Sequence, residues 1–262
     1  MSPGTARDCA AAQSRWRLED PASDFPFYGD SPVALSVGQW LLVMAAVAIG
    51  FLVLVLPIPW PGGPLGAWIP AVLFPVIPLA ALAHVAPGHW RLIFGKVGGR
   101  ECRLMIGFAL LNIVVSMSVG ALVSALADVA HNEAAGLLSG MDMAGRVAFF
   151  AKTLPQLFGE ELVTVLPFLA VLTALSKGFG IGRKGAIFGA WLISSVLFGL
   201  IHLPTYDWNL IQCVVVIGSA RLVLTLPWIM TKNIWVSTGA HVINDWLLFS
   251  FGLVAAGLVG KV

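Results

Sequence analysis

Several apolar stretches of about 20 residues, the length a helix needs to cross the hydrocarbon core of a bilayer, run through this chain of 262 residues. Hydrophobic residues make up 58% of it and charged residues only 11%, whereas soluble domains carry roughly 25% charged residues. The short alternating segments typical of an outer-membrane barrel are absent from the sequence. We therefore predict an all-α, polytopic membrane protein.

The chain divides into three predicted parts. Residues 1–37 are polar and lack the apolar core of a signal peptide, so we expect a mobile N-terminal tail. Residues 38–143 hold three transmembrane helices, and residues 144–259 hold four. The seven predicted spans are residues 38–56, 68–85, 104–126, 144–175, 185–203, 210–230 and 234–259. Because every ionisable group within a span lies in the last four, apart from His84 at the end of the second, we expect the catalytic core there.

The distribution of Lys and Arg predicts the orientation. With a cytoplasmic N-terminus, 11 of the 15 basic residues lie on the inside, in the tail, in the loops 91–103 and 177–184 and at Lys232, and three lie outside. Cytoplasmic loops of membrane proteins carry such an excess of Lys and Arg. We therefore predict an integral protein of a cytoplasmic membrane, in contact with its lipids, with the N-terminus inside.

Net charge and cysteine content exclude some function classes. A formal charge of +2 is too small to indicate a nucleic-acid partner. Cys9, Cys102 and Cys213 lie far apart and form no CxxC pair, which argues against a disulfide framework and against a thiolate metal site.

Two adjacent carboxylates, Glu160 and Glu161, lie inside the predicted span 144–175. A charge at mid-membrane costs roughly 2.5 to 3.5 kcal/mol on insertion scales, and such groups are usually functional and partnered. Successive helical positions point about 100° apart, so one carboxylate can face a cavity while the other reaches a neighbouring helix. We expect Arg221 to neutralise Glu161 or Asp245, or to bind a substrate carboxylate.

Two further spans contribute imidazoles. Phe198 and His202 lie four residues apart on one helix face, as do His241 and Asp245, with Asn244 close to that side. Water activation needs a base, imidazoles that hold the water or a metal, and an oriented polar group for the oxyanion. The alternative is a polar clamp that holds helices together.

The order and spacing of these residues resemble the CAAX protease and bacteriocin-processing family. Its three motifs, Glu-Glu-x-x-x-Arg, Phe-x-x-x-His and His-x-x-x-Asn/Asp, lie on successive helices, and residues 144–250 carry their counterparts. The resemblance implies an all-helical intramembrane endopeptidase that acts on a peptide or a lipidated protein. The implied catalytic residues are Glu160, Glu161, His202, His241 and Asp245, and the implied substrate-binding residues are Phe198, Arg221 and Asn244. Glu160 would activate water, His202 would hold it, and Glu161 would orient the site.

The chain departs from the first motif, because Val165 stands where the family has Arg. The sequence leaves the type of protease open, since His202, His241 and Glu160 could ligate Zn²⁺ with an open position or work without a metal. Residue counting places His202 about 25 Å and His241 about 12 Å from the inner ends of their spans, so convergence requires offset or broken helices.

Two other functions remain as alternatives. One is a non-catalytic scaffold or immunity factor that binds a peptide in the same polar cavity. The other is a small transporter or proton relay that uses the intramembrane carboxylates. No inverted repeat is found in the sequence, which argues against the transporter.

Overall fold

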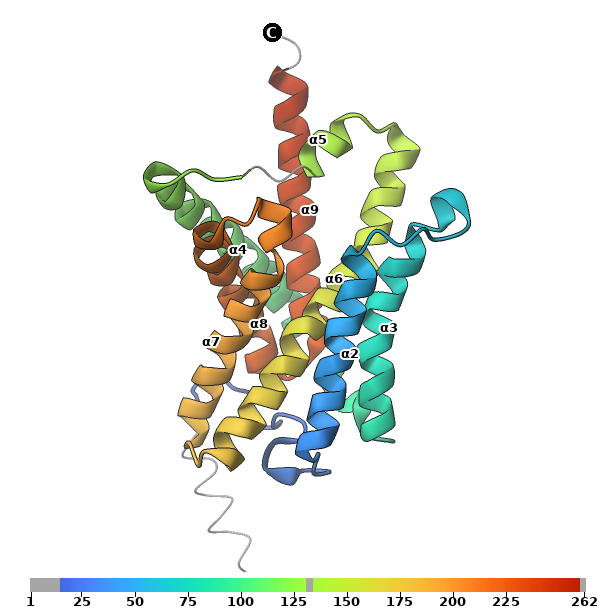
Figure 1. Cartoon of the computed structure of the whole chain (residues 1–262). Helices are drawn as coiled ribbons and strands as arrows, with labels where there is room; N and C mark the ends of the chain where they lie inside the picture. Colours follow the sequence, from blue (N-terminus) through green and yellow to red (C-terminus); the bar gives the residue numbers. More distant parts are fainter. Residues whose placement is uncertain (1–14, 131–133, 260–262) are drawn as a thin grey trace, which may run out of the picture.

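The computed structural model describes residues 15–130 and 134–259, and within these residues the regular structure is helical, without strands (Figure 1). The main helices are α2 (Val37–Val55), α3 (Trp68–Val85), α4 (Gly99–Leu126), α5 (Ala134–Ser139), α6 (Met143–Thr173), α7 (Arg183–Ile201), α8 (Gly218–Thr231) and α9 (Ile234–Val259). The prediction of an all-α, polytopic membrane protein is confirmed.

Six helical segments of the described part are long and apolar enough to cross a membrane: α2, α3, α4, α6 extended to Gly178, α7, and α8 with the preceding π-helical turn. The predicted seventh span is α9, a helix of 26 residues that lies outside this group. Its polar residues His241, Asn244 and Asp245 lower the hydropathy of its first two-thirds. The count of seven therefore stays a prediction.

Helix α6 is the central helix of the bundle (Figure 1). In its most apolar stretch 72% is buried in protein, whereas the other five spans range from 17 to 44%. It packs against α2, α3, α7 and α9. Gly159 permits the close approach to α3, because a Cβ there would lie 2.4 Å from the Phe74 ring. The helix continues through Pro155 and Pro167.

The N-terminal segment 15–36 packs against the end of the bundle where α7 begins, drawn as the lower end in Figure 1. The rings of Phe25 and Phe27 are only 2% and 1% exposed, and Phe25 contacts both Phe168 and Trp228. The prediction of a mobile tail is therefore wrong for residues 15–36. Residues 1–14 lie outside the described part.

A buried ionic cluster fixes this segment. The carboxylate of Glu19, which is fully buried, accepts from Arg183 at 2.6 Å and from Lys232 at 3.0 Å. Burial alone would raise the pKa of Glu19, but the backbone N–H of Trp16, Arg183 and Lys232 outweigh it, so the pKa lies below its ordinary 4.5. Burial lowers the pKa of Lys232 below its ordinary value, although the contact with Glu19 opposes that shift. The cluster joins the N-terminal segment to the start of α7 and to the α8–α9 connection.

Candidate active site

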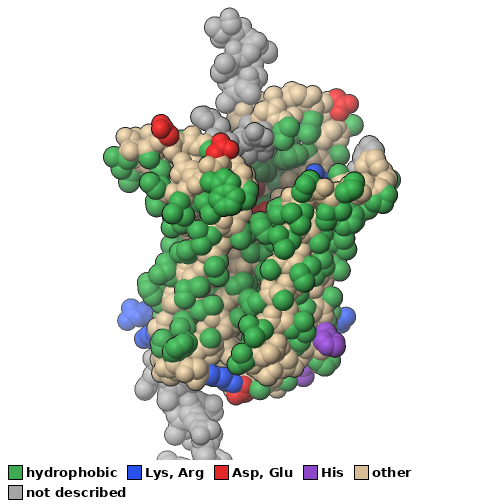
Figure 2. Space-filling model, viewed as in Figure 1, with side chains coloured by type: hydrophobic (Ala, Val, Ile, Leu, Met, Phe, Trp, Pro, Cys, Tyr) green, Lys and Arg blue, Asp and Glu red, His purple; other side chains and the backbone are tan. Residues whose placement is uncertain are grey.

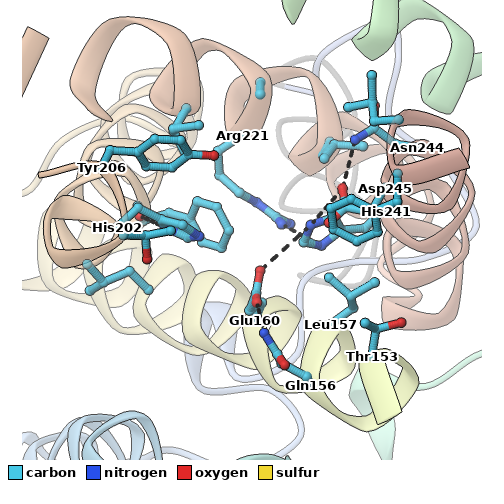
Figure 3. Close-up of a pocket in the computed structure, with 18 of the residues that line it drawn as sticks. Thr153, Gln156, Leu157, Glu160, His202, Tyr206, Arg221, His241, Asn244 and Asp245 are labelled. Atoms are coloured by element: carbon cyan, nitrogen blue, oxygen red, sulfur yellow. Dashed lines mark hydrogen bonds and ion pairs between the residues drawn. The ribbon is translucent and has the colours of Figure 1, made fainter. Parts of the chain in front are cut away.

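The predicted site residues gather around one cavity of about 780 Å³ at the upper half of the bundle. Helices α2, α4, α6, α7, α8 and α9 all contribute to its wall. The predicted residues that line it are Glu160, Phe198, His202, Arg221, His241, Asn244 and Asp245 (Figure 3). Glu161, fully buried, lies behind the wall. Residues from four separate predicted spans therefore meet in one place.

Arg221 on α8 is the partner of Glu161 on α6. Its two terminal nitrogens donate to the two carboxylate oxygens at 2.6 and 2.7 Å, and both side chains are fully buried. Val165, the position at which the family motif has Arg, is buried in the apolar core instead. The positive charge next to Glu161 therefore comes from α8.

The pair also fixes the tautomer of His241. Nδ1 of His241 lies 2.9 Å from Oε1 of Glu161 and 3.4 Å from the Arg221 guanidinium. Since an ionised carboxylate only accepts, the shorter contact requires that Nδ1 carry the proton and donate to Glu161. In the neutral ring the lone pair then belongs to Nε2, which lies 3.8 Å from Glu160 and 3.7 Å from Asp245. An imidazole nitrogen with two carboxylates just beyond direct hydrogen-bond distance leaves room for a shared proton or water.

Glu160 is the carboxylate that faces the cavity. Its side chain is 12% exposed, and Nε2 of Gln156, one turn earlier on α6, donates to it at 3.3 Å. Glu160 and Glu161 therefore divide as the helical geometry predicts, one toward the cavity and one toward α8.

His202 lies across the cavity from His241 and Asp245 (Figure 3). It caps α7, and its Nδ1 donates to the carbonyl oxygen of Phe198 at 2.8 Å, which leaves Nε2 as the acceptor nitrogen. The Phe198 ring lies 4.6 Å from the His202 ring and 6.2 Å from the His241 ring, centroid to centroid. Phe198 therefore contributes a packing surface between the two imidazoles.

The three predicted zinc ligands, His202, His241 and Glu160, do not form a ligand set. In the part of the chain that the structure describes, no three His, Cys, Asp or Glu side chains are arranged to hold a metal ion. Zinc binding stays a prediction.

Sequence reasoning missed Asn112, a buried polar residue of α4 that lines the cavity. Its Nδ2 donates to Oδ1 of Asn244 at 3.0 Å, and Nδ2 of Asn244 donates to Oδ1 of Asp245 at 2.8 Å. Because Asp245 only accepts when ionised, it fixes the Asn244 amide, which in turn fixes the Asn112 amide. The signal in the sequence was an uncharged polar residue near the middle of a span otherwise taken as apolar.

The comparison with protein families agrees with the motifs. Residues 144–247 match the family model described as Rce1-like, type II CAAX prenyl endopeptidase Rce1-like. The matched range contains every site residue predicted from the sequence, from Glu160 to Asp245. It confirms the resemblance and, because the family is one of proteases, supports protease activity. No curated protein and no solved structure matches the chain.

Proposed function

We propose that the chain is an intramembrane endopeptidase that hydrolyses a peptide bond in the cavity. The observation that carries this proposal is the position of His241, whose Nε2 lies 3.8 Å from Glu160 and 3.7 Å from Asp245 on the cavity wall. Two carboxylates around one orientated imidazole can accept, hold and return a proton, which hydrolysis requires at each of its steps.

Glu160 acts as the general base. It removes a proton from a water molecule while the water oxygen forms a bond to the peptide carbonyl carbon. Nε2 of His202, the acceptor nitrogen of that ring, holds the other hydrogen of the water. When the C–N bond breaks, the proton passes from Glu160, through His241, to the leaving amine. Glu161 and Arg221 keep the His241 ring in the required tautomer.

The substrate is a peptide segment of a membrane-associated protein or peptide, as in CAAX-type or bacteriocin-type processing. The cavity volume of about 780 Å³ lies within the range of about 300 to 1,000 Å³ for ligand sites in proteins. Apolar side chains from three helices, including Phe51, Phe149 and Phe249, line the cavity together with the polar groups. Such a lining suits a segment with apolar residues on both sides of the scissile bond.

The protein lies in a cytoplasmic membrane with its N-terminus inside. The lower end of the bundle, where α7 begins, carries most of the Lys and Arg residues of the described part. This end is therefore the cytoplasmic one.

A library of single-span reporters, with a randomised segment next to the span and a releasable tag, tests the proposal. We expect the tag to be released only when this protein is present. The rate of release should fall by roughly 10² to 10⁴ in Glu160→Gln, and it should also fall in His202→Ala and His241→Ala. Asp128→Asn, an exposed carboxylate outside the cavity, is the control with full activity. Full release in all three site variants contradicts the proposal. Retained peptide binding without any release by the wild type favours the non-catalytic scaffold.

A further inference from the structure

The cavity reaches the upper end of the bundle, and among the described residues its lining includes none from the N-terminal segment 15–36 or from the loops of the lower end. Its wall contains Val55, the last residue of α2, Lys152 near the start of α6, and Asp207 just after α7. The C-terminal ends of α2 and α7 and the N-terminal part of α6 lie at the upper end of the bundle in Figure 1. Arg221, fully buried in its pair with Glu161, also lines the cavity.

The lower end is closed by protein. The N-terminal segment 15–36 and its ionic cluster with Arg183 and Lys232 cover the side of the bundle opposite the mouth. Between the two ends lies a buried apolar layer that includes Leu166, Phe168 and Trp228. The site is thus separated from the lower surface by a packed core.

The charges of the described part divide strongly between the two ends. Two basic residues, Arg146 and Lys152, belong to the upper end. The basic residues of the lower end are Arg15, Arg17, Arg91, Lys96, Arg100, Arg103, Lys177, Arg183, Lys184 and Lys232. Figure 2 shows the same division on one face, with Lys and Arg mainly at the lower end and Asp and Glu mainly at the upper end. An excess of this size is typical of a cytoplasmic surface.

From the mouth and the charges together, we infer that the cavity opens to the non-cytoplasmic side of the membrane. Its substrate is then a peptide segment presented from that side: an exported peptide, or the external segment next to the span of an anchored protein. A lipidated C-terminus held at the cytoplasmic surface would face the closed end. The statement about the substrate rests on the proposed function. The side of the membrane to which the cavity opens does not depend on that function.

The two ends of α7 provide a matched test of sidedness. Thr205, exposed and on the cavity wall, follows the upper end of α7, and Lys184, also exposed, lies at its lower end. In a background with Cys9, Cys102 and Cys213 replaced by serine, Thr205→Cys and Lys184→Cys each carry a single thiol. Intact cells and permeabilised cells are treated with a membrane-impermeant maleimide, and the labelled fraction of each variant is measured.

We expect Thr205→Cys to be labelled in intact cells to the extent reached after permeabilisation. Lys184→Cys should be labelled only after permeabilisation. The reverse pattern overturns the inference, and so does labelling of both thiols in intact cells, because α7 would then not separate the two sides.

A second measurement separates this inference from the proposed function. The same randomised segment is placed on the external side of one single-span reporter and on the cytoplasmic side of another. Cleavage of only the external reporter supports both proposals. Cleavage of only the cytoplasmic reporter, with reversed labelling, supports the protease and overturns the sidedness. The expected labelling without cleavage of either reporter retains the sidedness and counts against the protease.

Discussion

Arg221 donates to both carboxylate oxygens of Glu161, at 2.6 and 2.7 Å, with both side chains fully buried between α6 and α8. A buried ion pair adds little net stability over apolar residues of the same volume, but leaving one charge unpaired is strongly destabilising. Here the pair has a second task, since Oε1 of Glu161 also accepts from His241. Stability and tautomer control therefore depend on the same contact.

We expect the single variants Arg221→Met and Glu161→Leu to lower the free energy of unfolding in detergent by about 3 to 5 kcal/mol. The double variant should recover most of that loss, because neither charge is left unpaired. It should still be inactive, since Nδ1 of His241 has lost its acceptor. Glu160→Gln is the control with nearly wild-type stability. A double variant as unstable as the two single variants would contradict this account of the pair.

Asn112 is expected to act as a positioning residue through Asn244 and Asp245. In Asn112→Leu, the carbonyl of Asn244 loses its donor, at a cost of about 1 to 3 kcal/mol, and its amide is free to turn away from Asp245. We predict a lower kcat with little change in KM, together with a shifted pH–rate profile. Ser116→Ala, one turn further along α4 and also on the cavity wall, is the matched control, because the Ser116 hydroxyl has no hydrogen-bond partner among the described residues. Equal effects of both substitutions on kcat would indicate a general packing role.

The stability of the N-terminal segment should depend on pH through Glu19. Its pKa in the folded protein lies below the ordinary 4.5, so the ionised carboxylate stabilises the fold above pH 4.5 and that contribution is lost as the pH falls through the folded value. Wild-type protein should therefore lose more stability on acidification than Glu19→Gln, which is already less stable at neutral pH. Asp20 titrates in the same direction in both proteins, so the difference between their unfolding curves isolates Glu19. Parallel loss in the two proteins would contradict the prediction.

The donor arrangement leads to a prediction for metal dependence. Because His202 lies across the cavity from His241, and no described group of three donors is arranged for a metal, we expect tag release to survive dialysis against a chelator. Activity that is lost on chelation and restored by Zn²⁺ would show instead that His202, His241 and Glu160 close on the ion.

The helical membrane fold and the residues of the three motifs could be predicted, because both follow from patterns among residues that are close together in the sequence. Span length and hydropathy mark the helices, and the spacing of four residues between Phe198 and His202, and between His241 and Asp245, puts each pair on one face. The acidic partner of Arg221 could not be predicted in this way, because it lies far away in the sequence. Glu161 and Asp245 were equally available in sequence, and only the packing of α6 against α8 selects Glu161.

Residue counting also predicted different depths for His202 and His241. The two imidazoles nevertheless line one cavity, because the cavity extends along α9 from His241 to Phe249 and so reaches the upper end of α7. The packed N-terminal segment could not be predicted for a similar reason. Glu19 looks like a solvated side chain until Arg183 and Lys232, more than 150 positions away, are brought to it.

The buried cluster around Glu19 has a consequence for motion. It joins the lower end of α7 and the α8–α9 connection into one base. To admit a polypeptide, the upper ends of these helices must then tilt apart. The hinge lies at the base, and the largest displacement occurs at the upper end of the bundle, where the cavity opens. Cutting the chain after Asp30 would remove the pivot, whereas every residue that lines the cavity lies after the cut.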